Sequence, residues 1–167
     1  MAQPTTLCVE VVDDFITALW TKLAWNLVGS SLSAISDVPV REIGRRPGLR
    51  SLAIQLVAEC RAVAEREGAH LEGGLVEEML GAFEGFPPTV RSSMWQDKHA
   101  GRPCEQDAIS GAMVRAAARH GLATPYAHMA TKLLESHSPS KPGSSRDTSA
   151  TDGSSDAGQN RGSAGAT

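Results

Sequence analysis

LWTKLAWNLVGSSLSAI, residues 19–35, is the stretch of sequence that decides the fold class. On a helix at about 100° per residue, its apolar side chains cover most of the circumference. They are Leu19, Trp20, Leu23, Ala24, Leu27, Val28, Leu32 and Ile35. A helix that is apolar nearly all round is usually buried. The stretch therefore predicts a long helix that packs inside the protein.

A narrow polar stripe interrupts this apolar surface. It consists of Lys22, Asn26, Ser30 and Ser33, which are four, four and three residues apart. A half-buried lysine costs free energy unless it is paired or used, so Lys22 and Asn26 are candidate site residues. The alternative stays open that Lys22 extends its ammonium to solvent while Asn26 makes a local polar contact. Gly29 beside the stripe would let another group approach the helix backbone closely.

The composition limits the class of protein. The chain has 167 residues, which suggests one domain, and its net charge of -3 with no basic face gives little support for nucleic-acid binding. Three widely separated cysteines without a CxxC motif fit a reduced, cytoplasmic protein, and the start MAQPTTLC does not have the pattern of a signal peptide. Residues 15–35 are long enough to span a membrane, but Lys22 and Asn26 argue against it.

The two ends of the chain differ from the middle. Residues 138–167 carry no large apolar side chain and are dominated by Gly, Ser, Asp and Thr. Such a segment cannot bury enough surface to offset its chain entropy, so it predicts a disordered tail. We expect one folded domain at residues 7–137, with a disordered start or linker remnant at residues 1–6.

The middle of the chain contains helix signals and almost no strand signals. Helices are predicted at about 12–36, 49–68, 74–84, 91–101, 105–120 and 125–136. Asp13 and Asp14 suit the dipole at the N-terminal end of the first helix, Pro125 suits the start of the last, and Gly68 and Gly121 suit C-terminal caps. Residues 37–48 form a connection rich in turn residues. The sum is an all-α domain of about six helices.

Other residues could carry chemistry, although each has an ordinary structural explanation. Glu105 is a second candidate, and its alternative is a carboxylate in the first turn of a helix. Ser92 and Ser93 are further candidates, and their alternative is helix capping. The possible metal ligands match no zinc spacing, so no metal site is predicted. These ligands are His99, Cys104 and His120. No GxGxxG motif follows a predicted strand.

Three segments in consistent order together resemble a known family. They are VEVVDDFITALW (9–20), LWTKLAWN (19–26) with SSLSAI (30–35) following, and RSSMWQDKHAGRPCEQDAISGAMVRAAARHGLATP (91–125). The last segment has the pattern Ser-Ser-Met-x-Gln-Asp, a basic loop, Glu-x-Asp and a helix ending in Gly-x-x-x-Pro. Residues 7–136 as a whole are similar to the C-terminal domain of ketopantoate reductases (2-dehydropantoate 2-reductases).

This resemblance implies a fold and a reaction. The family consists of 6-phosphogluconate-dehydrogenase-like two-domain reductases, in which an N-terminal Rossmann domain binds NADPH and the C-terminal domain is all-α. Hydride transfer reduces the ketone of ketopantoate to pantoate, a step of pantothenate and coenzyme A biosynthesis. The resemblance implies that Lys22 is the general acid and that Asn26 and Ser93 bind substrate. It also implies that Glu105 lies near the cofactor. A lysine suits that role, because negative charge develops on the ketone oxygen.

The sequence departs from the family pattern in two respects. Ser30 and Val40 stand where the family usually has asparagines, which bears on the identity of the 2-oxo acid. The resemblance also begins at the interdomain linker, so we expect this chain alone to be inactive. The expected partners are a 2-oxo acid such as ketopantoate, a Rossmann domain in trans and a second copy of the chain. The alternative is a non-enzymatic helical dimerisation or interaction module derived from such a reductase.

Overall fold

The computed structural model describes residues 14–137, and every regular element in this range is helical. The elements are α1 (Phe15–Ser36), α2 (Glu42–Arg45), α3 (Pro47–Arg66), α4 (Leu75–Glu84), α5 (Ser93–His99), the 3₁₀ turn η1 (Glu105–Asp107), α6 (Ser110–Arg119) and α7 (Pro125–Glu135). The all-α prediction is confirmed. The expectations for residues 1–6 and 138–167 lie outside the described residues.

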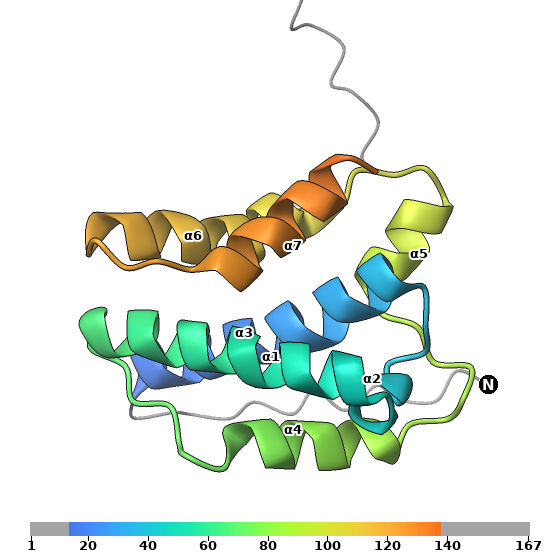
Figure 1. The fold of residues 1–167 in the computed structure, drawn as a ribbon, viewed down its shortest axis with the longest axis horizontal. Coiled ribbons are helices and arrows are strands. Elements are labelled where there is room, and N and C mark those ends of the chain that lie inside the picture. The colour runs from blue at the N-terminus through green and yellow to red at the C-terminus, as the bar shows by residue number, and fades with distance from the viewer. Residues whose placement is uncertain (1–13, 138–167) are drawn as a thin grey trace, which may run out of the picture.

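The helices surround a central pair. Figure 1 shows α1 and α3 side by side, with α6 and α7 on one side of them and α4 on the other. α5 lies near the C-terminal end of α1 and contacts it. α1 therefore contacts elements from every part of the described chain, as its nearly uniform apolar surface predicts.

The first residue of the described range caps α1. The Asp14 carboxylate accepts a hydrogen bond from the Thr17 amide at 3.0 Å, which satisfies one of the free N–H groups of the first turn. The hydrogen bonds from Thr17 also lower the pKa of Asp14.

No helix within residues 14–137, α1 included, is both long and apolar enough to cross a membrane.

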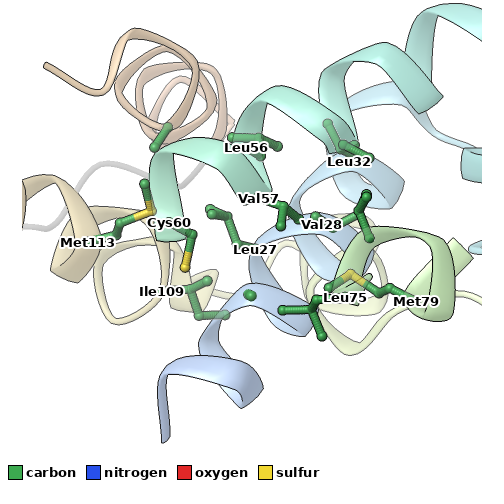
Figure 2. Packing of buried hydrophobic residues seen from close by; sticks show 14 of the residues in the cluster. Leu27, Val28, Leu32, Leu56, Val57, Cys60, Leu75, Met79, Ile109 and Met113 are labelled. Carbon is green, nitrogen blue, oxygen red and sulfur yellow. The ribbon is translucent and has the colours of Figure 1, made fainter. Parts of the chain in front are cut away.

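A single apolar core joins the layers. Figure 2 shows Leu27, Val28 and Leu32 of α1 packed with Leu56, Val57 and Cys60 of α3, Leu75 and Met79 of α4, and Ile109 and Met113 near α6. All of these side chains are buried. Burial raises the pKa of the Cys60 thiol to about 12, so this cysteine stays protonated at neutral pH and serves as an apolar core residue.

Several predicted helix ends are confirmed. Gly68 and Gly121 adopt the left-handed conformation after α3 and α6, with φ of 84° and 66°. A residue with a Cβ atom adopts that conformation only at a cost, which is why glycine is favoured there. Pro125 is the first residue of α7, where its missing N–H is not needed.

Two details of the helix prediction are wrong. Residues 105–120 form η1 and then α6, because Ile109 between them leaves helical geometry at φ -101° and ψ -87°. The Ser110 hydroxyl occupies the Gln106 carbonyl at 3.1 Å, which a continuous helix would use for a backbone amide. The connection 37–48 also contains the short helix α2, which is held by the fully buried Ile43. A single turn depends on such packing rather than on propensity.

The close approach expected at Gly29 occurs inside the protein. A Cβ atom at Gly29 would lie 3.0 Å from Cζ of Phe83 in α4. Phe83 is held in turn by an edge-to-face contact with Trp25, with ring centroids 5.5 Å apart. Gly29 therefore permits the packing of α4 against α1.

Alanine at Gly29 and at Gly81 should have opposite effects on stability. Gly29→Ala should lower the free energy of unfolding by on the order of 1 kcal/mol, because overpacking costs about 1–3 kcal/mol and helix propensity returns up to about 1. Gly81 lies within α4 with no atom near its Cβ position, so Gly81→Ala should raise it by about 0.5–1 kcal/mol. Urea denaturation measures both, and equal stabilisation by the two would contradict this packing.

Candidate functional site

Lys22 and Asn26 lie on the outer face of α1. Lys22 is exposed and Asn26 is half-buried, and neither side chain makes a hydrogen bond or ion pair with another residue in 14–137. The stripe becomes buried toward its C-terminal end, where the Ser33 hydroxyl donates to the Val38 carbonyl at 2.7 Å. Only the part of the stripe near Lys22 and Asn26 is therefore available to a ligand.

The two serines before α5 have different roles. The Ser92 hydroxyl accepts a hydrogen bond from the Trp95 amide at 3.1 Å and lies 3.3 Å from the Ser30 carbonyl, to which it donates. Ser92 is thus the helix cap, and it also ties the start of α5 to α1. Ser93 is the first residue of α5, is exposed, and has no side-chain partner within the described range. Its hydroxyl is available to a ligand.

Glu105 is the first residue of η1 and is exposed. It makes no ion pair with any residue between 14 and 137. The preceding Cys104 places it, because the Cys104 thiol lies 3.8 Å from the Met94 carbonyl oxygen. The start of η1 is therefore beside the first turn of α5.

These contacts bring three elements together. Ser92 joins α5 to α1 at Ser30, and Asn26 precedes Ser30 by about 6 Å along the helix axis, given a rise of 1.5 Å per residue. Lys22 lies about 12 Å from Ser30 on the same scale. The meeting of Lys22, Asn26, Ser93 and Glu105 on one open face stays a prediction.

An apolar groove lies beside this region. It has a volume of about 420 Å³ and is formed mainly by the N-terminal half of α1 and by α6. None of the four candidate residues lines it. Phe15 and Leu19 of α1 are 65% and 50% exposed, and they precede Lys22 on the same helix face. An exposed apolar surface is therefore continuous with the candidate site.

The residues considered as metal ligands have other partners. His99 lies against Asp37, and His120 Nε2 lies 2.8 Å from the Glu67 carboxylate. Hydrogen bonds from His120 and Arg119 lower the pKa of Glu67. No group of three or more His, Cys, Asp or Glu side chains within 14–137 could hold a metal ion.

The candidate residues have complementary chemistry. Lys22, Asn26 and Ser93 each carry a hydrogen-bond donor without a partner in the described range, and Glu105 carries an acceptor. Donors of this kind suit a small anion with carboxylate and carbonyl oxygens.

Comparison with known proteins decides the family. The profile described as "Ketopantoate reductase PanE/ApbA C terminal" matches residues 14–138. The chain belongs to the ketopantoate reductase family. The resemblance found in the sequence is thereby confirmed. The 2-dehydropantoate 2-reductase of Caulobacter vibrioides is 37% identical over 130 residues, which are 78% of this chain and 44% of that protein. The Mycobacterium tuberculosis enzyme of the same name is 36% identical over 126 residues, or 75% and 42%.

Solved structures share the fold. A dimeric ketopantoate reductase from Staphylococcus aureus superposes with a TM-score of 0.70 at 29% identity, covering 76% of this chain and 44% of that one. D-mandelate dehydrogenase in complex with NADH and anilino(oxo)acetate superposes with a TM-score of 0.67 at 29% identity, covering 75% and 53%. The chain spans less than half the length of the Caulobacter vibrioides and Mycobacterium tuberculosis enzymes.

Proposed function

We propose that the chain is the catalytic and substrate-binding helical half of an NADPH-dependent 2-dehydropantoate 2-reductase. It would reduce ketopantoate to pantoate in pantothenate and coenzyme A biosynthesis. The observation that carries the proposal is that Lys22, Asn26 and Ser93 present unpartnered donors on elements that Ser92 ties together. The names of the relatives support the substrate.

Each donor has a part in the proposed reaction. The Lys22 ammonium would donate a hydrogen bond to the ketone oxygen and transfer its proton there as negative charge develops. Asn26, one turn along, would orient the substrate, and Ser93 would donate to its carboxylate. NADPH, when bound, supplies the hydride that adds to the carbonyl carbon. The product is then a 2-hydroxy acid.

Within residues 14–137, we propose one contact to the cofactor, Glu105, and no site for its pyrophosphate. Glu105 is exposed beside α5 and is the residue proposed to face the cofactor. A pyrophosphate group needs a glycine-rich turn leading from a strand to a helix, and residues 14–137 contain no strand. We therefore propose that a Rossmann domain supplies this site, in trans or from a longer chain. The exposed Phe15 and Leu19 support such a contact, because large apolar side chains in one patch mark interaction surfaces.

The substrate is proposed as a 2-oxo acid, with ketopantoate first. Ser30 is half-buried and its carbonyl is occupied by Ser92, while Val40 is buried in the core. Neither position supplies the side-chain amide usual in the family. A panel of 2-oxo acids with fewer hydroxyl groups than ketopantoate should therefore be assayed beside it. The D-mandelate dehydrogenase neighbour supports including aromatic 2-oxo acids in that panel.

The second candidate function is that of a non-enzymatic interaction module. The exposed apolar face of α1 is also what a non-enzymatic dimerisation or interaction module would show. The dimeric Staphylococcus aureus reductase supports a homodimer for the reductase half and for the interaction module alike.

The test that separates the two functions is to fuse the dinucleotide-binding part of the Caulobacter vibrioides enzyme ahead of Leu7 and to measure NADPH oxidation with each 2-oxo acid. Turnover supports the reductase, and a folded, inactive fusion supports the interaction module.

Alanine at the two neighbouring serines should separate binding from stability. Ser93→Ala in the fusion should raise KM for the 2-oxo acid by about tenfold to a hundredfold, because a hydrogen bond to a charged group contributes about 1.5–3 kcal/mol. Its melting temperature should not change. Ser92→Ala removes the cap and should lower the free energy of unfolding by about 1 kcal/mol. An unchanged KM in Ser93→Ala would remove Ser93 from the site.

A further inference from the structure

Asp37, Trp95 and His99 form a compact cluster between the end of α1 and α5. The Trp95 indole N–H donates to Asp37 Oδ1 at 2.5 Å, and His99 Nε2 lies 3.3 Å from the same oxygen. The imidazole of His99 stacks on the Trp95 ring with centroids 3.7 Å apart. The family resemblance does not account for this cluster, whose residues are not among the four candidate site residues.

His99 adds two contacts to this cluster. Its Nδ1 lies 3.0 Å from the Trp95 carbonyl oxygen one turn back along α5, and its Nε2 lies 3.3 Å from Asp37 Oδ1. Within the cluster, the hydrogen bond that joins the end of α1 to α5 is the one from the Trp95 indole to Asp37.

The charged groups around His99 come from each neighbouring segment. Asp37 at the end of α1 is the anion that faces it. The Arg91 guanidinium, just before α5, lies 4.9 Å from the Trp95 ring centroid. On α5, Lys98 donates to the Ala34 carbonyl at 2.8 Å. Asp97 pairs with Arg102 at 2.7 Å. The bond from Lys98 therefore adds a second contact between α5 and the last turns of α1.

We propose that Asp37, Trp95 and His99 are positioning residues that hold α5 against α1 and so hold Ser93 at the candidate site. The part of this proposal that concerns Ser93 and the substrate rests on the proposed function. The cluster and the Ser92 contact to Ser30 secure the two ends of α5, a helix of only seven residues. Such a short helix depends on these contacts for its position.

The Asp37 carboxylate is the acceptor of the Trp95 indole. The hydrogen bond from that indole is the main cause that lowers the pKa of Asp37. Asp37 is therefore ionised at neutral pH, and the charge-assisted bond to Trp95 is lost only as pH falls through the pKa of Asp37 in the acid range.

The test is amide hydrogen exchange of the full chain at neutral pH, compared between the parent and a variant of the cluster. The amides followed are those of Trp95 and Gln96, which bond to the hydroxyl and carbonyl of Ser92. After correction for the intrinsic exchange rate, both amides should be protected in the parent.

The matched variant is Asp37→Asn, because asparagine also tolerates the left-handed backbone of Asp37, at φ 57°. It should lower the protection of both amides several-fold, whereas His120→Gln, at the remote Glu67 pair, should behave as the parent. In the fusion, Asp37→Asn should raise KM for the 2-oxo acid and leave kcat nearly unchanged. Superimposable protection in the parent and in Asp37→Asn would overturn the proposal. The exchange readout is free of ligand, so an inactive fusion would count against the proposed function alone.

Discussion

Lys22→Ala should lower the turnover of the fused reductase by about 10²-fold or more, the scale of a lost general acid. The ammonium is the group proposed to stabilise the developing negative charge on the ketone oxygen and to deliver the proton. An alanine leaves that oxygen to water, which is neither positioned nor charged. The loss should appear in kcat as well as in kcat/KM, because the interaction strengthens in the transition state.

The structure predicts that this variant folds normally. Lys22 is exposed and has no ion pair or hydrogen bond within residues 14–137, so its removal breaks no described contact. The matched control is Lys132→Ala on α7, where the ammonium pairs with Glu135 at 2.7 Å on an exposed surface. Exposed pairs of this kind contribute little to stability, and turnover should be unchanged. A fusion whose turnover is indifferent to Lys22→Ala would refute the proposed mechanism.

The helices that could be predicted are those whose signals are local. The apolar surface of α1 and the caps at Asp14, Gly68 and Gly121 depend on residues within a few positions of each helix end. Pro125 marks the start of α7 for the same reason. Caps, prolines and helical periodicity act through the backbone of the same segment, so the sequence contains them directly.

The details that could not be predicted depend on contacts between distant segments. α2 forms because Ile43 is buried, and Gly29 is needed because Phe83 packs on it from α4. The break at Ile109 is followed by Ser110, whose hydroxyl donates to the Gln106 carbonyl and accepts from Thr131 of α7 at 2.8 Å, a contact that helical periodicity does not show. In each case tertiary packing decided what local propensity left open.

The candidate site shows the same division. Spacing alone placed Lys22 and Asn26 on one helix face, and the structure places them there. Capping chemistry alone did not distinguish Ser92 from Ser93, because either hydroxyl could cap a helix at that point. The structure makes the distinction, because the Trp95 amide donates to the Ser92 hydroxyl, which in turn donates to the Ser30 carbonyl 62 residues away. The Asp37–Trp95 hydrogen bond, 58 residues apart, was likewise invisible in the sequence pattern.

The polypeptide of residues 1–167 alone should neither bind NADPH measurably nor reduce ketopantoate. A dinucleotide is held mainly through its pyrophosphate, which needs backbone N–H groups at a glycine-rich turn and the start of a helix. The described residues form helices without a strand, and the sequence contains no GxGxxG motif. Glu105 is an anion, and an exposed carboxylate cannot attract a phosphate.

Calorimetric titration with NADPH and an assay of its oxidation with ketopantoate test this prediction on the chain and on the fusion side by side. The chain should give no heat of binding and no turnover, whereas the fusion should give both. The contrast is informative because the two samples share Lys22, Asn26, Ser93 and Glu105 and differ in the dinucleotide-binding domain. Robust turnover by the chain alone would show that its helices hold the cofactor by themselves, and the half-enzyme proposal would then be wrong.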